Sequence, residues 1–599
     1  MARSPRRRAV LACTLVAVVC SISIGLRLNA PALLLADWGY DDALFTDLAW
    51  HLVQGDWLGP YDDLTIAKGP GYPLFIAGVY QVHLPLKLVE HVVHLLAAGT
   101  MAAAATRVSR SRWLGLAVFT ALALDPTYLG RWGSVVARDG IYGSLSLLLV
   151  GAVLLALTSL PDLTRRRLVW AAPAVALVGA VIGVVGAGYY LTREERIWLV
   201  PTVAASVVLA GALWWRRGHG RTRPAVILVG ALVAGAAVTA TLAVGSVAAE
   251  NEDRYGTSLT SDLAGGEIVR AYAEWQRIDV GEPMLLIPVT SLQREAAYRV
   301  SPAAAELEDY LDEADSRFMG PQWCPPERAR CEYTGSYFVW AMREGAQVTG
   351  HGADGAEAQQ FFGRMADEIA AACDAGDVPC VARGPASMPP LARVDRSRFL
   401  PSLAQGTTYL FSFDMAEPAG ATRSAGSREN WQAMLRPLRG IDGSLADHNA
   451  AERRAAGRQQ VVYGLADGYR WAARLGVVPA MLGLGAALIT RAGRRHWPVV
   501  GLALVMLVAV LSRLALLAVV DATAFRAATY GAYPLPAVGF LVVFLVTGWW
   551  LLGACVADRW RGRGSSVDEA GGAEEVEPER DGDDRLDAPT PGDARLVPQ

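Results

Sequence analysis

The sequence has almost no net charge, and this absence removes one broad class of partner. Its 599 residues carry a formal net charge of −3 at pH 7, so charge gives no argument for nucleic-acid binding. The chain also lacks a glycine-rich nucleotide-binding pattern, a metalloprotease helix and an internal repeat. We therefore look for its chemistry outside those classes.

Cysteine is scarce, with seven in the whole chain. Three lie in or beside apolar runs, and the other four lie in a polar stretch: Cys324, Cys331, Cys373 and Cys380. Four such residues fit two disulfides, which need an oxidising compartment. Two equal spacings suggest the pairs Cys324–Cys331 and Cys373–Cys380, although sequence does not fix connectivity and free thiols remain the alternative.

Long apolar runs are what the chain has in abundance, since 53% of it is hydrophobic. A helix needs about 20 residues to cross the core of a bilayer. Such runs predict spans near 10–28, 86–106, 113–125, 140–160, 168–190, 197–215, 224–248, 471–490, 497–519 and 535–556. We expect an all-α polytopic membrane domain of about ten or eleven transmembrane helices.

The shorter apolar segment 72–84 leaves that count open. If it crosses fully, the basic cluster Arg107–Arg112 moves outside, against the tendency of basic loops to stay in the cytoplasm. Pro85 could instead break one irregular crossing over 72–106, which is tolerated where protein surrounds the backbone. The first run, with basic residues before it, is expected to be an uncleaved signal anchor.

Basic clusters predict the orientation, because they favour the cytoplasmic side. They are Arg3–Arg8, Arg107–Arg112, Arg165–Arg167, Arg216–Arg223, Arg491–Arg495 and Arg559–Arg563. Both termini are then cytoplasmic. We expect a transmembrane module over 1–249, an extracytoplasmic domain over 250–470, transmembrane helices over 471–560, and an acidic tail over 561–599 that buries too little apolar surface to fold.

Residues 250–470 read as a soluble domain that is α/β or mostly α. Pro302–Arg317 has the form of a helix capped by Ser301. Gly355–Cys373 is a second predicted helix, with an apolar stripe on one side. Met284–Val289 and Thr407–Phe413 are candidate strands.

The segment from Asp37 to Pro73 holds the strongest candidates for chemistry. Asp41 and Asp42 stand at the start of an amphipathic helix suited to a membrane surface. One of them could act as a general base, although helix capping explains them equally well. Lys68, in Lys68-Gly-Pro-Gly-Tyr-Pro73, could contact a lipid phosphate or simply reach out of the membrane interface.

Further candidates lie on the next outer loop and on the helix before it. Arg131 and Arg138 suit phosphate recognition and Asp139 is a second acid, with a plain Arg138–Asp139 ion pair as the alternative. His91 shares a helix face with Lys87, Glu90 and His94, which could line a lipid-headgroup site, pack helices or, less readily, hold a metal.

Two remaining groups of charged residues differ in how strongly they indicate a functional site. Arg193–Arg196 carries two Arg and two Glu residues, and mutual pairing explains them, so it is a weak candidate site. Arg513 lies within a predicted span and carries more weight, because an ionisable side chain there is costly. Arg526 lies at the outer end before the last span and could close a cavity that holds the other candidate residues.

Residues 10–160 carry a family resemblance. Asp41-Asp42 after the first span, a helix ending in Gly55-Asp56-Trp57, and Lys68 to Pro73 re-entering the membrane together resemble the C-type (GT-C) membrane glycosyltransferases. The closest branch holds the protein O-mannosyltransferases and lipid A aminoarabinose transferases. Gly69-Pro70-Gly71 replaces the Pro-Pro of that branch. Leu124-Asp125-Pro126, with the residues up to Asp139, is similar to the next outer motif.

The resemblance implies an inverting transfer of one sugar from a polyprenyl-phosphate carrier to an envelope acceptor, either glycan, lipid or protein. It makes Asp41 or Asp42 the base and Asp139 a second acid, with Lys68, Arg131 and Arg138 on the leaving phosphate. A divalent metal is possible, because relatives differ in using one. The alternatives are a transporter or flippase of a lipid-linked glycan, with functional charges at mid-membrane, and a non-catalytic membrane-anchored binding protein.

Overall fold

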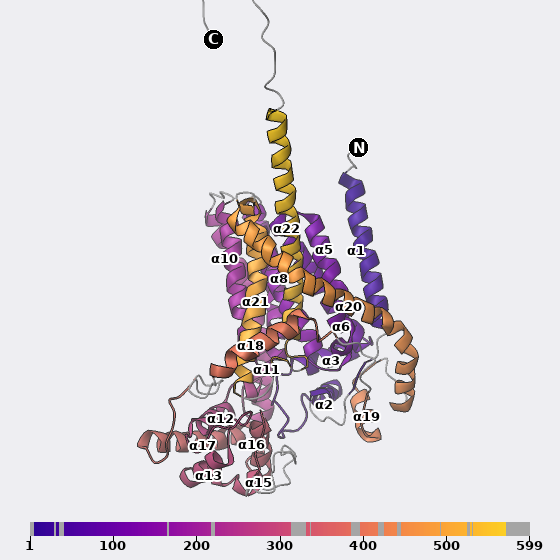
Figure 1. The fold of residues 1–599 in the computed structure, drawn as a ribbon. Coiled ribbons are helices and arrows are strands. Elements are labelled where there is room, and N and C mark those ends of the chain that lie inside the picture. Colours follow the sequence, from indigo (N-terminus) through magenta and orange to yellow (C-terminus); the bar gives the residue numbers. More distant parts are fainter. Residues whose placement is uncertain are drawn as a thin grey trace, which may run out of the picture.

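The computed structural model describes residues 5–28, 32–34, 41–164, 167–216, 222–312, 331–335, 337–384, 396–416, 424–439, 445–490, 493–523, 527–529 and 531–570. Within these ranges the regular structure is helical, and extended pairing is limited to isolated bridges. The bundle consists of α1 (Pro5–Leu28), α4 (Leu86–Ser109), α5 (Arg112–Ala123), α8 (Asp139–Leu163), α9 (Leu168–Thr192), α10 (Val200–Arg216), α11 (Thr222–Tyr255), α20 (Leu445–Ile489), α21 (Trp497–Asp521) and α22 (Leu535–Ala570) (Figure 1).

The apolar runs become membrane-length helices. In the described part of the chain, nine helices are long and apolar enough to span a bilayer, and nine of the ten predicted spans fall in them. The tenth, 113–125, forms α5, whose 12 residues extend only about 18 Å. The fold is therefore an all-α, multi-pass membrane fold.

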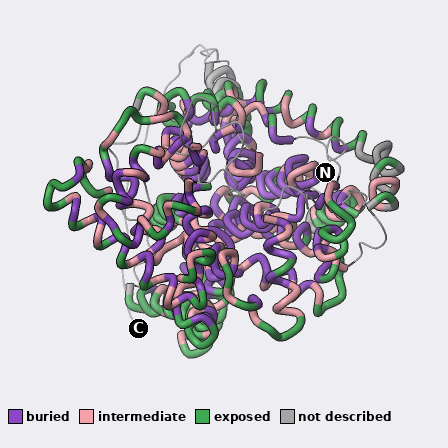
Figure 2. Tube along the Cα trace, turned by 90° about the horizontal axis from the view of Figure 1, so that it is seen from below, coloured by how far each residue is buried: buried purple, intermediate pink, exposed green. Residues whose placement is uncertain are grey.

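The outer surface of the bundle supports this conclusion. Buried positions gather at its centre and exposed ones on the outer turns (Figure 2). Among the exposed ones are large apolar side chains that water would not favour: Val208 on α10 is 70% exposed, Leu242 on α11 is 68% exposed and Leu475 on α20 is 64% exposed. Apolar side chains that face outward along whole helices are typical of contact with lipid.

Contacts between helix termini identify the two ends of the bundle. At one end, Arg107 near the end of α4 pairs with Asp162 near the end of α8, and His496 before α21 pairs with Asp558 in α22 at 3.1 Å. At the other end, Asp139 at the start of α8 pairs with Arg193 after α9. Successive helices therefore run in opposite directions, with α5 to α7 returning the chain between α4 and α8.

The segment 72–84 does not cross the bundle. It forms α3 (Gly71–Gln81), which extends about 16 Å and packs against α2 (Asp41–Gln54). Pro85 then adopts an extended conformation and α4 begins at Leu86, with 24 residues for a crossing of its own. Neither alternative left open by the sequence, a full crossing by 72–84 or one irregular crossing over 72–106, matches this arrangement.

Residues 262–378 pack around a hydrophobic core of their own, centred on Trp275, Phe338 and Met365. We call their helices the insert helices: η3 (Asp262–Ala264), α12 (Glu267–Arg277), α13 (Ser291–Val300), α14 (Pro302–Ala305), α15 (Glu308–Asp312), α16 (Tyr337–Val348) and α17 (Gly355–Ala375). The expected helix Gly355–Cys373 is present. The capped helix from Pro302 is present too, but it breaks after Ala305, and 313–317 lie outside the described residues.

Both predicted strands are wrong. Met284–Val289 forms a tight turn in which Met284 bridges to Ile287. Thr407–Phe413 instead belongs largely to α18 (Arg396–Phe411), a helix that packs on α21. The Thr407 hydroxyl donates back to the Leu403 carbonyl at 2.6 Å, which lets a β-branched residue fit a helix. Packing against α21 overrides strand propensity here.

The segment after residue 396 belongs with the bundle rather than with the insert helices. Besides α18, α19 (Arg428–Leu435) packs on α2, and α20 runs unbroken from Leu445 into the bundle. A boundary at 470 therefore does not match the structure. The polar composition of 445–470 masks the first turns of a 45-residue helix.

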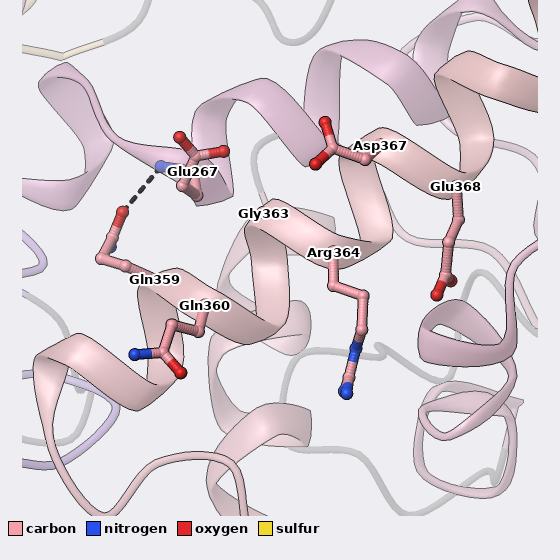
Figure 3. Close-up of a pocket in the computed structure, with 7 residues that line it drawn as sticks. All are labelled: Glu267, Gln359, Gln360, Gly363, Arg364, Asp367 and Glu368. Atoms are coloured by element: carbon pink, nitrogen blue, oxygen red, sulfur yellow. Dashed lines mark hydrogen bonds between the residues drawn. The ribbon is translucent and has the colours of Figure 1, made fainter.

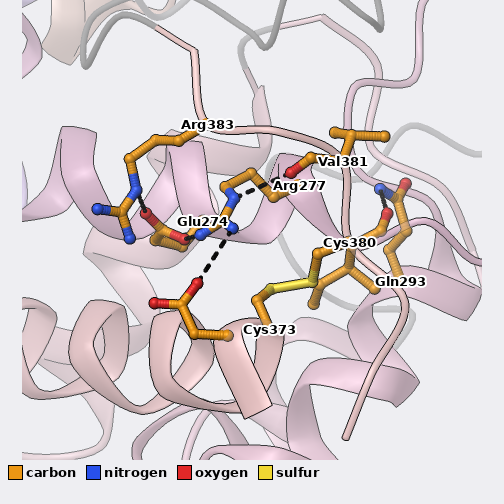
Figure 4. Close-up of a disulfide and its surroundings, with 9 residues drawn as sticks. Glu274, Arg277, Gln293, Cys373, Cys380, Val381 and Arg383 are labelled. Atoms are coloured by element: carbon orange, nitrogen blue, oxygen red, sulfur yellow. Dashed lines mark hydrogen bonds and ion pairs between the residues drawn. A yellow bond between two sulfur atoms is a disulfide. The ribbon is translucent and has the colours of Figure 1, made fainter. Parts of the chain in front are cut away.

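A disulfide, Cys373–Cys380, ties the end of α17 to the segment beside α12 (Figure 4). That segment is also held by backbone bonds from Val381 to Arg277 at 2.8 Å and from Asp279 to Pro379 at 2.7 Å. Cys331 is disulfide-bonded as well, whereas Cys324 lies outside the described residues. Of the two expected pairs, Cys373–Cys380 is present.

Replacing Cys373 and Cys380 by Ser should loosen the insert helices. Closing a loop of about eight residues contributes about 2.5 kcal/mol by the chain-entropy relation. We expect faster amide hydrogen exchange in α12 and α17 and unchanged exchange in α8. Cys13→Ser, at an exposed free cysteine, is the control, and equal protection in both variants would contradict the prediction.

Candidate functional site

The helix α2 brings the acidic pair to the end of the bundle where α8 begins. Its apolar face, which includes Leu44, Phe45 and Leu48, is buried. Phe45 meets the Tyr72 ring of α3 edge-on, with ring centroids 5.5 Å apart. The face predicted to lie on a membrane surface is therefore covered by protein, and this fixes the orientation of the first turn of α2.

Asp41 and Asp42 are placed differently. The Asp42 side chain is buried, and its Oδ1 accepts a hydrogen bond from the adjacent Ala43 amide at 3.0 Å. The Asp41 side chain is 31% exposed and pairs with Lys68. Asp41 is thus the carboxylate that a ligand can reach, a distinction that sequence alone did not make.

Two cations from different parts of the chain, Lys68 and Arg138, meet at Asp41. Its Oδ1 pairs with the Lys68 ammonium, and its Oδ2 lies 3.7 Å from Nε of Arg138. The Lys68 and Arg138 side chains are only 12% and 7% exposed, and both lie over the Phe45 ring. The structure therefore joins three of the predicted site residues in one cluster.

Glu194 links this cluster to the chain around Lys68. Its two carboxylate oxygens accept hydrogen bonds from Nη1 of Arg138 at 2.9 and 2.8 Å. The same carboxylate accepts the backbone amide of Gly69 at 3.1 Å. A side chain at Gly69 would collide with the Leu191 carbonyl, so glycine is what allows the chain to approach α9 here.

A second group of ion pairs lies beside the first. Arg193 pairs with Asp139, the remaining predicted acid, and its Nε lies 3.0 Å from Glu195. Glu195 also lies 3.5 Å from Nη1 of Arg513, whose guanidinium is fully buried and donates to the Tyr533 carbonyl. We call the two groups together the charged cluster: Asp41, Lys68, Arg138, Asp139, Arg193, Glu194, Glu195 and Arg513.

The residues that sequence reasoning undervalued are Arg193, Glu194 and Glu195. They were expected to pair chiefly with one another, whereas each also pairs with another element of the fold. The signal was present in the sequence, since four consecutive charges stand between two apolar runs. Pairing along the chain gave a sufficient local explanation and concealed the long-range partners.

The cations of the cluster determine the charge state of Asp41. Burial alone would raise the pKa of this carboxyl, but Lys68 and Arg138 outweigh burial and lower it to about 2. Burial lowers the pKa of Lys68, against the opposing pull of Asp41. Asp41 is therefore ionised at neutral pH and is a weak proton acceptor as long as its cations stay in place.

The stability of the fold should depend on this pairing in acid. A carboxyl whose pKa falls on folding, here from 3.8 to about 2, stabilises the fold above pH 3.8 and loses that effect as pH falls through 2. We expect about 1 to 2 kcal/mol at neutral pH after allowance for solvent screening, with about half lost by pH 3.

Asp41→Asn isolates this contribution. Thermal unfolding in detergent should show a lower Tm for the variant at pH 6, and the gap should narrow as pH approaches 3. A gap independent of pH would show that Asp41 stabilises the fold by packing and not by charge.

A buried polar seam extends from the charged cluster into the bundle. Glu90 accepts a hydrogen bond from the Tyr72 hydroxyl at 2.7 Å and pairs with Lys87 at 2.7 Å. Lys87 and Glu90 lie in the first two turns of α4. Deeper in the bundle, His91 bonds the Ser23 hydroxyl at 2.8 Å. The charges of the seam thus lie near the end of the bundle and are already paired.

The seam gives no support to a metal site. His94 bonds the Leu122 carbonyl at 2.9 Å and lies near the Ser144 hydroxyl at 3.3 Å, so its ring is committed to protein partners. Across the residues that the structure describes, no group of three His, Cys, Asp or Glu side chains is arranged to hold a metal ion.

The remaining predicted residues are placed elsewhere or not at all. Arg131 lies on α7 (Arg131–Ser134), with its guanidinium 4.9 Å from the centre of the Trp132 ring. Asp125 is fully buried and caps α6 (Pro126–Leu129), accepting the Thr127 amide at 2.9 Å. Arg526 lies outside the described residues.

An open groove on the insert helices lies between α12 and α17 (Figure 3). Its charged side chains already have partners: Arg270 pairs with Glu267 at 2.5 Å and with Asp367 at 2.6 Å. Glu368 accepts the Ser301 hydroxyl at 2.6 Å. The groove is therefore a less suitable place for chemistry than the charged cluster.

No protein-family model matches this chain, and no curated protein matches it significantly. The family resemblance therefore rests on the short sequence motifs between Asp41 and Asp139 alone.

Proposed function

We propose that this protein is a membrane glycosyltransferase that moves a sugar from a polyprenyl-phosphate donor to an envelope acceptor outside the cytoplasmic membrane. The observation that carries the proposal is the partly exposed Asp41 carboxylate between Lys68 and Arg138, at one end of a multi-pass bundle. A base beside two cations suits a reaction in which a hydroxyl loses a proton and a phosphate leaves.

The reaction assigns a role to each partner. The acceptor hydroxyl oxygen bonds to the anomeric carbon, the bond from that carbon to the phosphate oxygen breaks, and the hydroxyl proton passes to Asp41. Lys68 and Arg138 stabilise the charge on the leaving polyprenyl phosphate. Attack from the side opposite the phosphate inverts the sugar.

The low pKa of Asp41 fits this sequence of events. A bound phosphate competes with Asp41 for Lys68 and Arg138, and losing these cations raises the pKa of the carboxyl. Asp41 then becomes a better proton acceptor only when the donor is present. Glu194 keeps Arg138 in place meanwhile through its paired hydrogen bonds.

The orientation is part of the proposal. Among the described basic residues, Arg107, Arg112, Arg216 and Arg559 lie at the end of the bundle opposite the charged cluster. Membrane helices whose ends carry basic residues favour the orientation with those ends in the cytoplasm. In that orientation the charged cluster and the insert helices face outside, where lipid-linked sugars meet envelope acceptors.

Cysteine labelling in intact cells tests this orientation. After reduction, Cys373 and Cys380 should react with a membrane-impermeant maleimide. Cys555, in the last turns of the membrane-length part of α22 (Leu535–Trp560), should react only after permeabilisation. Labelling in the reverse order would place the charged cluster in the cytoplasm and remove the proposed reaction.

A transfer assay tests the activity itself. Purified protein in detergent or nanodiscs would receive radiolabelled polyprenyl-phosphate sugars and a mixture of envelope glycans, lipids and proteins. Transfer of label to one acceptor class supports the proposal. Movement of labelled lipid across proteoliposomes without transfer would favour a flippase instead.

A further inference from the structure

The loop that carries Lys68 is held by the insert helices, although the contacts join residues about 195 to 280 positions apart in sequence. Arg343, on α16, donates hydrogen bonds from Nε to the Asp63 carbonyl at 2.7 Å and from Nη2 to the Thr65 carbonyl at 2.9 Å. The Arg343 side chain is 4% exposed and also pairs with the buried Asp262. One guanidinium thus fixes both the loop and the start of the insert helices.

The two residues directly before Lys68 are held in the same way. The Asp262 amide donates to the Ile66 carbonyl at 2.9 Å, and the Leu263 amide to the Ala67 carbonyl at 3.3 Å. Ile66 is buried and has a φ of +50°, a conformation that costs a β-branched residue energy and persists only when its surroundings enforce it. These hydrogen bonds to the insert helices hold Ile66 in that conformation.

One turn before Arg343 on α16, Trp340 covers the Lys68 side chain. Its ring centre lies 5.2 Å from Nζ of Lys68, within the range of a cation–π contact. On the other side, the Gly69 amide is bonded to Glu194. Lys68 is therefore held by the insert helices on one side and by the loop after α9 on the other.

We propose that Trp340 and Arg343 are positioning residues that hold the Lys68 ammonium at Asp41, so that the insert helices complete the charged cluster. Arg343 acts through the backbone of residues 62–67, and Trp340 acts by covering the ammonium. A displacement of α16 would release Lys68 from Asp41 and weaken binding of any anionic group at this place.

The lysine content of the chain allows a direct test. Lys68 and Lys87 are its only two lysines, and Lys87 is buried in the bundle, paired with Glu90. Competitive acetylation across a pH series, read by mass spectrometry on the full-length protein in detergent, gives the reactivity and titration midpoint of Lys68, with Lys87 as internal reference. This measurement requires no enzymatic activity.

Trp340→Leu should raise the limiting acetylation rate of Lys68 at high pH by about fivefold, because the amine loses its cover. It should also shift the titration midpoint of Lys68, because both the burial and the Asp41 pairing that set its pKa change. Trp340→Phe, which keeps an aromatic ring, should restore wild-type behaviour. Arg343→Gln should have an effect as large as that of Trp340→Leu. Arg364→Gln, at an exposed position of α17 paired with Glu306, is the matched control on the insert helices.

If Trp340→Leu leaves both the rate and the midpoint of Lys68 unchanged, the proposal is overturned, whether or not Arg343→Gln folds. One consequence rests on the proposed function: Trp340→Leu should raise KM for the phosphate donor about fivefold with little change in kcat. An inactive wild-type protein would overturn the proposed function and leave the acetylation result intact.

Discussion

Asp41→Asn is expected to lower sugar transfer by about a hundredfold or more, the usual contribution of a general base. Asparagine keeps the shape of the side chain and can still accept a hydrogen bond from Lys68, but it cannot take up the acceptor proton. The loss should appear in kcat, with the donor KM unchanged or lowered, because the phosphate no longer competes with a carboxylate for Lys68 and Arg138. Initial rates with a labelled polyprenyl-phosphate sugar measure both quantities.

Two matched variants separate this role from a structural one. Asp47→Asn changes an exposed carboxylate on the same helix and should transfer at the wild-type rate. Asp42→Asn changes a buried carboxylate in the first turn of α2 and should lower stability more than kcat. Retention of more than about a tenth of the wild-type kcat by Asp41→Asn would be too small a loss for a general base.

The membrane helices could be predicted from the sequence because their signal is local. Apolar runs of sufficient length predicted nine helices, and most of their ends agree within a few residues, although the helices around 224–248 and 471–490 extend further into polar sequence. The segment 72–84 was harder, because its apolar content matches a short crossing as well as a helix lying at one end of the bundle. Only the tertiary contacts of α3 with α2 decide between these arrangements.

The charged cluster was predictable only in part, and the reason is physical. Charged groups of these types suit a phosphate site, so the sequence alone identified Asp41, Lys68 and Arg138 as candidates. Their partners Glu194 and Trp340 lie far away in the chain, and nothing in local spacing shows that they converge. Ion pairs between elements depend on the packing of α8 and α9, which the hydrophobic pattern does not encode.

The charges that favoured a transporter have a different meaning in the structure. Lys87 and Glu90 lie in the first two turns of α4 and pair with each other, while Arg513 pairs with Glu195 and donates to the Tyr533 carbonyl. A transport site would place ionisable groups near the middle of the span. These groups instead extend the charged cluster at one end of the bundle, which suits catalysis at the membrane interface.

Arg138→Gln is expected to affect both stability and donor binding. Arg138 is buried between Asp41 and Glu194, and removing one partner of a buried pair costs about 3 kcal/mol. Loss of a guanidinium–phosphate contact should also raise the donor KM by about 10- to 100-fold. Thermal unfolding measures the first effect and initial rates measure the second.

Glu194→Gln in the Arg138→Gln background separates these two effects, because it removes the carboxylate that Arg138→Gln leaves unpaired. The double variant should regain most of the lost stability but keep the raised KM, since no guanidinium faces the phosphate. Arg107→Gln, which breaks an exposed pair at the far end of α8, should change neither quantity measurably. If the double variant recovered the wild-type KM, Arg138 would serve only to neutralise Glu194, and Lys68 would be left as the cation on the leaving phosphate.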